Sequence, residues 1–218
     1  LRKKPIMLLK GKFQNGRSGE RTRKLLVVVQ YTASMILLCG TLIVFAQLNY
    51  MRRQSLGVRT DRILVVKFPG PTEGMKIKME AMRKAIRKLP LVSKVTCSGS
   101  VPGEEVAMFL SNRRTHDALK QNRLYEMLSC DPDYMDAYGL ELVAGRGFSE
   151  DYGDDVNKLV INETAARTLG YTDYESVIGE EISVETIEEP MQVIGVVKDY
   201  HQQALNRNYT PIMLFHKD

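Results

Sequence analysis

The pattern of apolar and polar positions is dominated by one long stretch, which runs from Leu25 to Asn49 without a charged residue. As a helix, its first 24 residues would span about 36 Å, against roughly 30 Å for the hydrocarbon layer of a membrane. A buried helix of a soluble protein is rarely apolar for so long. A cleaved signal peptide would be shorter and would end in small residues, whereas this stretch runs into Arg52 and Arg53. The pattern therefore predicts a transmembrane helix over residues 25–48.

Beyond this helix the pattern changes to short β-rich runs and helical periodicity. Residues 61–68 and 91–97 are rich in branched apolar side chains, as expected for strands. Between them, residues 73–89 place Met79, Met82 and other apolar residues at steps of three and four, which is one face of a helix. Basic residues largely off that face favour a solvated surface over a binding patch. The three segments together predict a β-α-β unit.

Further elements follow towards the C-terminus. Asn162 as a cap and Gly170 as a stop predict a helix between them. In the same way, Asp131 and Gly139 are expected to cap and end a short helix. Strands are expected over residues 123–130, 140–144, 158–161, 181–186, 192–198 and 212–215, with a helical turn over 174–178, whereas residues 104–121 fit neither pattern. This mixture predicts an α+β fold.

Charge is distributed unevenly along the chain, whose formal net charge is +5. Residues 1–24 carry nine basic residues and one acidic residue, a net charge of +8, so the other 22 basic and 25 acidic residues give −3. Because basic residues concentrate on the cytoplasmic side of membrane helices, we expect the N-terminus in the cytoplasm and residues 49–218 outside it. The basic arm is then expected to lie on anionic lipid. A nucleic-acid-binding domain would instead spread its basic residues over a folded face, so we expect no nucleic-acid partner.

No catalytic or metal-binding pattern stands out in the sequence. The histidines, His116, His201 and His216, are not spaced as a metal-binding pair, and there is no HExxH or CxxC motif. The chain also lacks the phosphate-binding sequence GxxxxGK followed by Ser or Thr, so we do not expect it to bind ATP itself. The acidic residues within 150–155 lack the order of a calcium loop and read as a solvated loop. We therefore expect no enzyme, no cofactor and no metal site.

The cysteines are divided by the predicted topology. Cys39 lies within the membrane stretch, where it serves as packing. Cys97 and Cys130 each end a predicted strand on the outer side, an oxidising compartment, so they are candidates for a disulfide. The favoured alternative is two free thiols, which a thiol count would detect.

The membrane stretch and four later motifs together resemble a known family. Residues 26–66, which begin LVVVQYTASM, resemble the membrane helix and exit segment of FtsX-like permeases, and more specifically the MacB-type permease of ABC exporters in the long form of Bacteroidetes-like bacteria. The motifs follow in the order of that family: DPDYMDAYGLELVAGRGFSED (131–151), VINETAARTLGY (160–171), VIGEEI (177–182) and VIGVVKDYHQQAL (193–205). The resemblance covers residues 8–218, and LLKGKF (8–13) resembles the entry to the second half of the duplicated form.

The resemblance implies a MacB-like periplasmic core domain behind one N-terminal transmembrane helix. In this family a β-α-β "porter" subdomain holds an inserted "sabre" subdomain. The implied division is a cytoplasmic basic linker over 1–24, a transmembrane helix over 25–48 and the extracytoplasmic domain over 49–218, with the porter at about 61–103 and 191–218 and the sabre at about 123–190. The family's porter has a further β-α-β unit, so the porter here is expected to be incomplete at its C-terminus. The chain also lacks an initiating Met, and we expect it to be a fragment of a larger protein.

The resemblance also implies a role. The chain would be the permease component of an ABC-type exporter, for efflux or lipoprotein release, in the bacterial inner membrane with residues 49–218 in the periplasm. Its outer domain would relay motion driven by ATP hydrolysis to substrate or adaptor. The implied partners are an ATP-binding subunit or domain, a second permease protomer or half, membrane lipid and, as a further candidate, a periplasmic adaptor protein. The substrate, whether drug, peptide or lipoprotein, stays open.

Asp199, Tyr200 and His201 end the last motif and are candidates for contact with a partner. The structural alternative, in which Asp199 and His201 close a strand, is the favoured one. For the whole chain the alternative function is a single-pass membrane-anchored sensor or ligand-binding ectodomain. An anchored extracytoplasmic enzyme is disfavoured because no converging set of catalytic groups is present in the sequence.

Overall fold

The computed structural model describes residues 17–68, 75–116, 121–149 and 155–216. It divides into two compact units, Leu1–Gln54 and Ser55–Asp218. The first unit contributes the helix α2, and the second contributes all the other elements that the structure describes.

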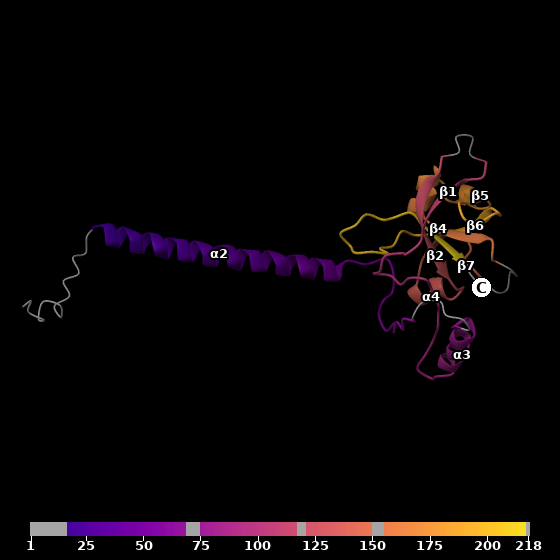
Figure 1. Cartoon of the computed structure of the whole chain (residues 1–218), viewed down its shortest axis with the longest axis horizontal. Coiled ribbons are helices and arrows are strands. Elements are labelled where there is room, and N and C mark those ends of the chain that lie inside the picture. Colours follow the sequence, from indigo (N-terminus) through magenta and orange to yellow (C-terminus); the bar gives the residue numbers. More distant parts are fainter. Residues whose placement is uncertain (1–16, 69–74, 117–120, 150–154, 217–218) are drawn as a thin grey trace, which may run out of the picture. The chain divides into compact units, whose positions relative to one another are not determined.

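Helix α2 (Arg17–Arg53) is continuous over 37 residues and is the long indigo helix of Figure 1. Ser34 and Thr41 donate from their hydroxyls to carbonyl oxygens four residues earlier, at 2.9 and 2.8 Å. These polar groups are therefore satisfied inside the helix, as a membrane requires. Within its unit the helix exposes apolar side chains on every side, which suits a lipid environment better than water. The helix predicted over 25–48 is confirmed, and by length and composition it is able to cross a membrane.

The second unit is built on one seven-stranded sheet. Strand β6 pairs with β4, β3 and β5, and β5 also pairs with β1. Six strands therefore close a ring in the order β6, β4, β7, β2, β1 and β5, while β3 extends from β6. The β2–β7 and β4–β6 pairs are parallel and the other pairs are antiparallel. The strands are β1 (Phe109–Arg114), β2 (Arg123–Cys130), β3 (Leu142–Gly145), β4 (Lys158–Asn162), β5 (Glu181–Val184), β6 (Met191–Val197) and β7 (Ile212–His216).

Side chains of the central strands alternate between two hydrophobic clusters, because successive residues of a strand point to opposite faces. On β4, Leu159 and Ile161 belong to the first cluster, which includes residues of α5, whereas Val160 belongs to the second, which includes residues of α4. On β7, Met213 and Leu214 divide in the same way. The central strands are thus covered on both faces, which explains why their sequences are almost continuously apolar.

Gly195 shifts this alternation on β6. Val193 and Val196 both face the first cluster although they are three positions apart, and the β4–β6 register shifts at the same point. This is the signature of a β-bulge. A Cβ atom on Gly195 would overlap the backbone of Arg146, so the close approach of the two chains excludes any side chain there.

The described residues of the second unit also form three helices and one 3-10 turn: α3 (Met75–Arg87), α4 (Tyr134–Tyr138), α5 (Glu163–Leu169) and η2 (Glu175–Val177). Helix α5 confirms both of its predicted ends. The Asn162 side chain accepts a hydrogen bond from the Ala165 N–H at 2.9 Å, and Gly170 has a φ of 98°, which favours glycine. The α+β class, the helix within 73–89 and the six predicted strands, which are β2 to β7, are also confirmed.

The predicted β-α-β unit is wrong in its strands. Within residues 61–68 and 91–97, Asp61, Arg62 and Leu91 lie in turns, and the structure gives neither segment a ladder with the residues it describes. The nearest feature is one isolated bridge between Ser98 and Cys130. The apolar pattern of these segments is that of strands, but a strand also needs a partner with free backbone groups.

Two further predictions differ from the structure. Residues 104–121, which fit no pattern, contain the strand β1, whose Asn112 is fully buried although it is polar. Asp131 does not cap α4, which begins at Tyr134 after Asp133. The acidic residues 150–154 lie outside the described residues. The division into porter and sabre stays a prediction; strands from 123–190 and from 191–218 lie in the same sheet.

Candidate functional site

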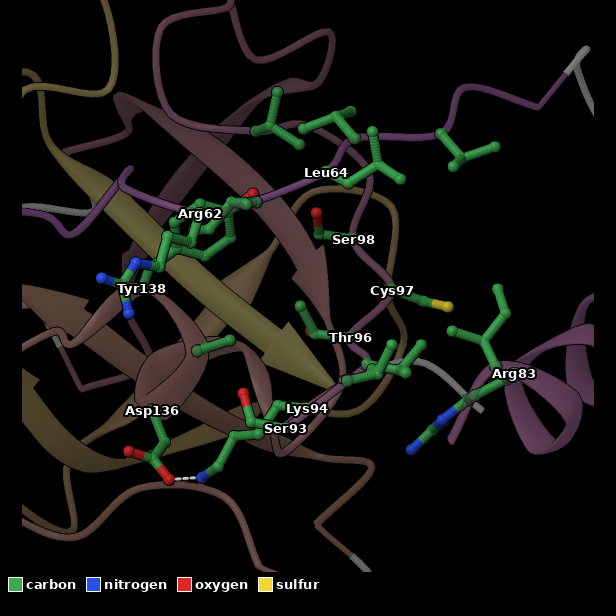
Figure 2. Close-up of a pocket in the computed structure, with 18 of the residues that line it drawn as sticks. Arg62, Leu64, Arg83, Ser93, Lys94, Thr96, Cys97, Ser98, Asp136 and Tyr138 are labelled. Carbon is green, nitrogen blue, oxygen red and sulfur yellow. Dashed lines mark ion pairs between the residues drawn. The ribbon is translucent and has the colours of Figure 1, made fainter. Parts of the chain in front are cut away.

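A cavity of about 780 Å³ opens in the second unit beside α3. Its walls are two segments without a ladder among the described residues, 61–68 and 91–98, together with one face of α3. Asp136 and Tyr138 of α4 also contribute to the lining. Figure 2 shows both segments converging on this space, with Leu64 on one and Cys97 on the other. The site is therefore a groove between these two segments and a helix.

The helix wall of the groove is apolar because α3 is amphipathic. Met79, Met82 and Ile86 line the groove and are half-buried. Their spacing of three and four residues places them on one face, as the sequence predicts. The exposed basic residues Lys78 and Lys84 lie on the same helix but outside the lining. Flexible methionines suit a surface whose occupant varies in shape.

Charged side chains attach the groove walls to the rest of the second unit. The buried Asp131 carboxylate accepts hydrogen bonds from the Thr96 hydroxyl and from the Cys97 N–H, the latter at 2.9 Å. From α3, Arg83 Nη1 lies 3.6 Å from the same carboxylate, and its Nη2 lies 3.7 Å from that of Asp133. Arg87 also pairs with Asp133. Asp131 thus joins the segment 91–98, α3 and the end of β2 instead of capping a helix.

A further ion pair joins the groove rim to α4. Lys94 pairs with Asp136, as the dashed line in Figure 2 marks. These partners come from separate elements, and Asp131 carries the ordinary sequence signature of a helix cap. Sequence reasoning therefore missed the ionic part of the site, and the one signal that indicated the groove was the apolar face of α3.

Cys97 faces the groove, whereas Cys130 is buried in the second cluster. Ser98 pairs directly with Cys130, so the side chain of the preceding residue, Cys97, points to the opposite side of that bridge. In Figure 2 the Cys97 side chain is directed towards α3 and the Ser98 side chain away from it. Both thiols are free. Burial and the nearby Asp131 raise the pKa of Cys97, and burial raises the pKa of Cys130 further.

The three residues proposed for partner contact occupy different environments. The Asp199 carboxylate accepts from the backbone N–H and the hydroxyl of Thr164, each at 2.8 Å, and pairs with Arg167. Tyr200 is 1% exposed in the second cluster, and burial raises its pKa. The half-buried His201 ring lies 4.5 Å from that of Tyr209, centroid to centroid. Asp199 and Tyr200 therefore have structural roles, while partner contact stays a prediction that falls chiefly on His201.

The structure describes one residue of the acidic stretch 150–155, Asp155. No group of three or more His, Cys, Asp or Glu side chains in the described part of the chain gathers in a way that could hold a metal ion. Asp155, the described end of the acidic stretch, is buried against Arg146, with its oxygens at 2.8 and 3.0 Å from the guanidinium nitrogens. Hydrogen bonding to Arg146 lowers the pKa of this carboxyl.

The fold and groove define an α+β domain that follows an apolar helix, and comparison with known proteins identifies the family. Residues 32–217 match the model of the MacB-like periplasmic core domain. The chain therefore belongs to the MacB-like periplasmic core domain family, as its motifs indicate. No curated protein matches it significantly.

Two solved structures illustrate similar domains. The chain is 19% identical to the extracellular domain of the noncanonic ABC-type transporter YknZ from Gram-positive bacteria, over 63% of this chain and 61% of that one, with a TM-score of 0.45. It is 20% identical to the periplasmic region of MacB from Actinobacillus actinomycetemcomitans, over 68% of this chain and 62% of that one, with a TM-score of 0.43. The chain thus spans about three fifths of each solved domain. The family match, and not these distant similarities, carries the assignment.

Proposed function

We propose that this chain is the permease component of an ABC-type exporter and that its outer domain relays ATP-driven motion. The observation that carries the proposal is the continuous family match, which begins inside α2 at residue 32 and runs to residue 217. An apolar helix of membrane-spanning length followed by this domain fits a membrane protein with a large extracytoplasmic part. The excess of basic residues before α2 supports a cytoplasmic N-terminus in the bacterial inner membrane and a periplasmic domain.

A mechanical relay needs the chain that leaves the membrane helix to be held firmly by the outer domain. Leu56 and Arg59, which lie just after the boundary between the two units, make such contacts. The Leu56 carbonyl accepts from the His201 N–H at 2.8 Å, and the Arg59 N–H donates to the Tyr138 carbonyl at 2.7 Å. Between them Gly57 has a φ of 77°, and a Cβ there would lie 3.1 Å from Tyr200. Movement of this segment would thus be passed to the sheet through Tyr200 and to α4 through Tyr138.

In this function the chain is not itself an enzyme. Hydrolysis of ATP would occur in a separate ATP-binding subunit or domain in the cytoplasm. A second permease protomer or half would move against this one, and membrane lipid would surround α2. Such a relay requires two states whose balance the nucleotide changes.

The ATPase activity of a co-expressed ATP-binding subunit, measured in lipid with and without this permease, tests the partnership. We expect the permease to change the rate of hydrolysis. Crosslinks between cysteines placed on the outer domains of paired permeases should also change between nucleotide-free and ATP-plus-vanadate conditions. Unchanged crosslinks under both conditions would rule out the relay.

The groove favours a second candidate function, a membrane-anchored sensor or ligand-binding ectodomain. A cavity of about 780 Å³ lies within the size range of ligand pockets. The ATPase measurement separates the two functions, because a sensor would leave hydrolysis by the subunit unchanged. Further membrane helices encoded by the same gene, with an ATPase gene beside it, would favour the permease.

A further inference from the structure

A second, smaller cavity of about 190 Å³ lies beside the hairpin of β1 and β2. Its walls come from the end of β1, the start of β2 and the C-terminal end of α5. Pockets for drug-sized ligands typically hold about 300–1,000 Å³. This cavity therefore suits a compact chemical group.

The cavity is remote from the described end of the chain. Strand β2 pairs in parallel with β7, where Cys130 lies opposite His216, the last described residue. Arg123, which lines the cavity, lies at the other end of β2, about 23 Å away along the strand. The chain therefore leaves the sheet at the end opposite the cavity.

Two arginines of the cavity carry charge that no carboxylate compensates. Arg113 Nη1 donates to the side-chain carbonyl of Asn122 at 3.3 Å, and Arg123 donates to the backbone carbonyl of Thr168 at the end of α5. Both acceptors are neutral, and neither arginine forms an ion pair within the described part of the chain. Because a guanidinium has five N–H donors, each arginine keeps donors for a ligand.

Tyr125 adds a buried polar group without a partner to the same cavity. Its side chain is 1% exposed and lines the cavity, and it lies two positions from Arg123 on β2, hence on the same face. Its hydroxyl makes no hydrogen bond with any residue that the structure describes. Burial raises the pKa of Tyr125 to about 12, so the hydroxyl stays protonated and is able to donate. A buried tyrosine hydroxyl normally has a partner, so this one indicates a ligand.

We propose that this cavity binds a phosphate monoester, whose phosphate oxygens accept hydrogen bonds from Arg113, Arg123 and Tyr125. The two guanidinium charges match the charge of nearly −2 on such a phosphate at neutral pH. The planar guanidinium group also matches the geometry of phosphate oxygens. The carbonyl end of a helix repels anions, and Arg123 offsets this effect at α5 through its bond to Thr168. The inference stands whether or not the chain acts as a permease.

Calorimetric titration of phenyl phosphate into the full chain, in a neutral detergent at pH 8, tests the proposal. We expect saturable binding to one site per chain. Phenyl sulfate has the same shape with one negative charge fewer, so this matched control should bind about tenfold more weakly. Arg113→Gln should weaken binding of phenyl phosphate about tenfold. Arg21→Gln, which removes the same charge from the basic arm, should change it little.

Tyr125→Phe separates a binding role from a structural one. Because the hydroxyl has no partner among the described residues, its loss should leave the thermal stability of the free chain unchanged. The same change should weaken binding of phenyl phosphate about tenfold, since a hydrogen bond to a charged group is lost. Tyr209→Phe, on the loop between β6 and β7, is the matched control and should leave binding unchanged.

A soluble lipid with the same phosphate group, dihexanoyl phosphatidate, distinguishes two sources of the ligand. Tighter binding than that of phenyl phosphate would indicate a lipid headgroup, and weaker binding would indicate a free ester. Three outcomes would overturn the proposal. They are no saturable binding to a chain with native circular dichroism, equal affinity for phenyl sulfate, and wild-type affinity in both Arg113→Gln and Tyr125→Phe, which would place the anion elsewhere on the chain.

Discussion

The Asp199 carboxylate accepts hydrogen bonds from both the backbone N–H and the side-chain hydroxyl of Thr164, each at 2.8 Å. In return, the Glu163 carboxylate accepts from the Asp199 N–H at 2.9 Å. The loop after β6 is thereby fixed to the first turn of α5, where unpaired N–H groups favour a negative charge. Asp199 is therefore a cap of α5 that comes from 35 positions away in the sequence.

Replacing this distant cap should destabilise the domain. Asp199→Ala is expected to lower the free energy of unfolding by about 1–2 kcal/mol, as for other lost caps, because three donors of α5, two on Thr164 and one on Arg167, lose their acceptor. Urea denaturation followed by circular dichroism measures the change. The neighbouring Lys198→Ala removes an exposed ion pair with Glu141 and should leave the free energy of unfolding almost unchanged. Equal losses in the two variants would contradict the capping role.

The Asp155–Arg146 pair should make stability depend on acid. Its folded pKa is lowered by hydrogen bonding to Arg146, so the ionised carboxylate favours the folded state. This stability is present above the ordinary pKa of Asp, about 4, and is lost as the pH falls through the lower folded value. Asp155→Asn should therefore cost roughly 1–3 kcal/mol at pH 7 and progressively less in acid. Urea titrations at several pH values measure the difference, and a loss independent of pH would count against the pair.

Glu126 should behave in the opposite sense. It is buried on β2, and burial raises its pKa although Gln203 donates to it at 3.1 Å. Its other carboxylate oxygen has no hydrogen-bond partner among the described residues. A raised folded pKa means that stability is present below the ordinary pKa and is lost as the pH rises through the folded value. Glu126→Gln should thus stabilise the protein at pH 8 relative to the wild type, and this advantage should shrink at pH 4.

Because two stretches of backbone approach each other closely at the β6 bulge, we predict that Gly195 tolerates no side chain. Gly195→Ala should cost about 2–3 kcal/mol, because the new methyl group overlaps the Arg146 backbone and the strands must move apart. Gly170→Ala is the matched comparison, since it has open space around it but a φ of 98°. That variant should cost about 1 kcal/mol. Thermal unfolding of the two variants should therefore rank Gly195→Ala as the less stable.

The cysteines provide a chemical check on the arrangement around Ser98. In a Cys39→Ser chain purified without reductant and then denatured, a thiol count should find two free thiols. Under native conditions, alkylation should modify Cys97, which lines the groove, long before the buried Cys130. Both reactions should accelerate only at alkaline pH, because the pKa of each thiol is raised. A count of zero would establish a disulfide and contradict the geometry.

Much of the site could not be predicted from the sequence because its residues come together only in the folded chain. Asp131 before a proline is a sound local signal for a helix cap. Its carboxylate instead accepts hydrogen bonds from Thr96 and Cys97, about 35 residues earlier. The strand β1 was missed because its polar Asn112 is buried, with its side-chain N–H groups directed at the sulfur atoms of Met127 and Met213. Neither neighbour lies on β1, so no local pattern could indicate that burial.

The sequence by itself determined the features that depend on neighbouring residues. These are the apolar helix α2, the capped helix α5 and the β-character of strands β2 to β7, because hydrophobic periodicity and caps act over a few positions. The tertiary structure decided which of the β-prone runs found partners. Residues 158–161 lie between β6 and β7, whereas the equally apolar residues 61–68 border a groove. Pairing depends on which backbone groups reach each other across the fold, and that information is not local.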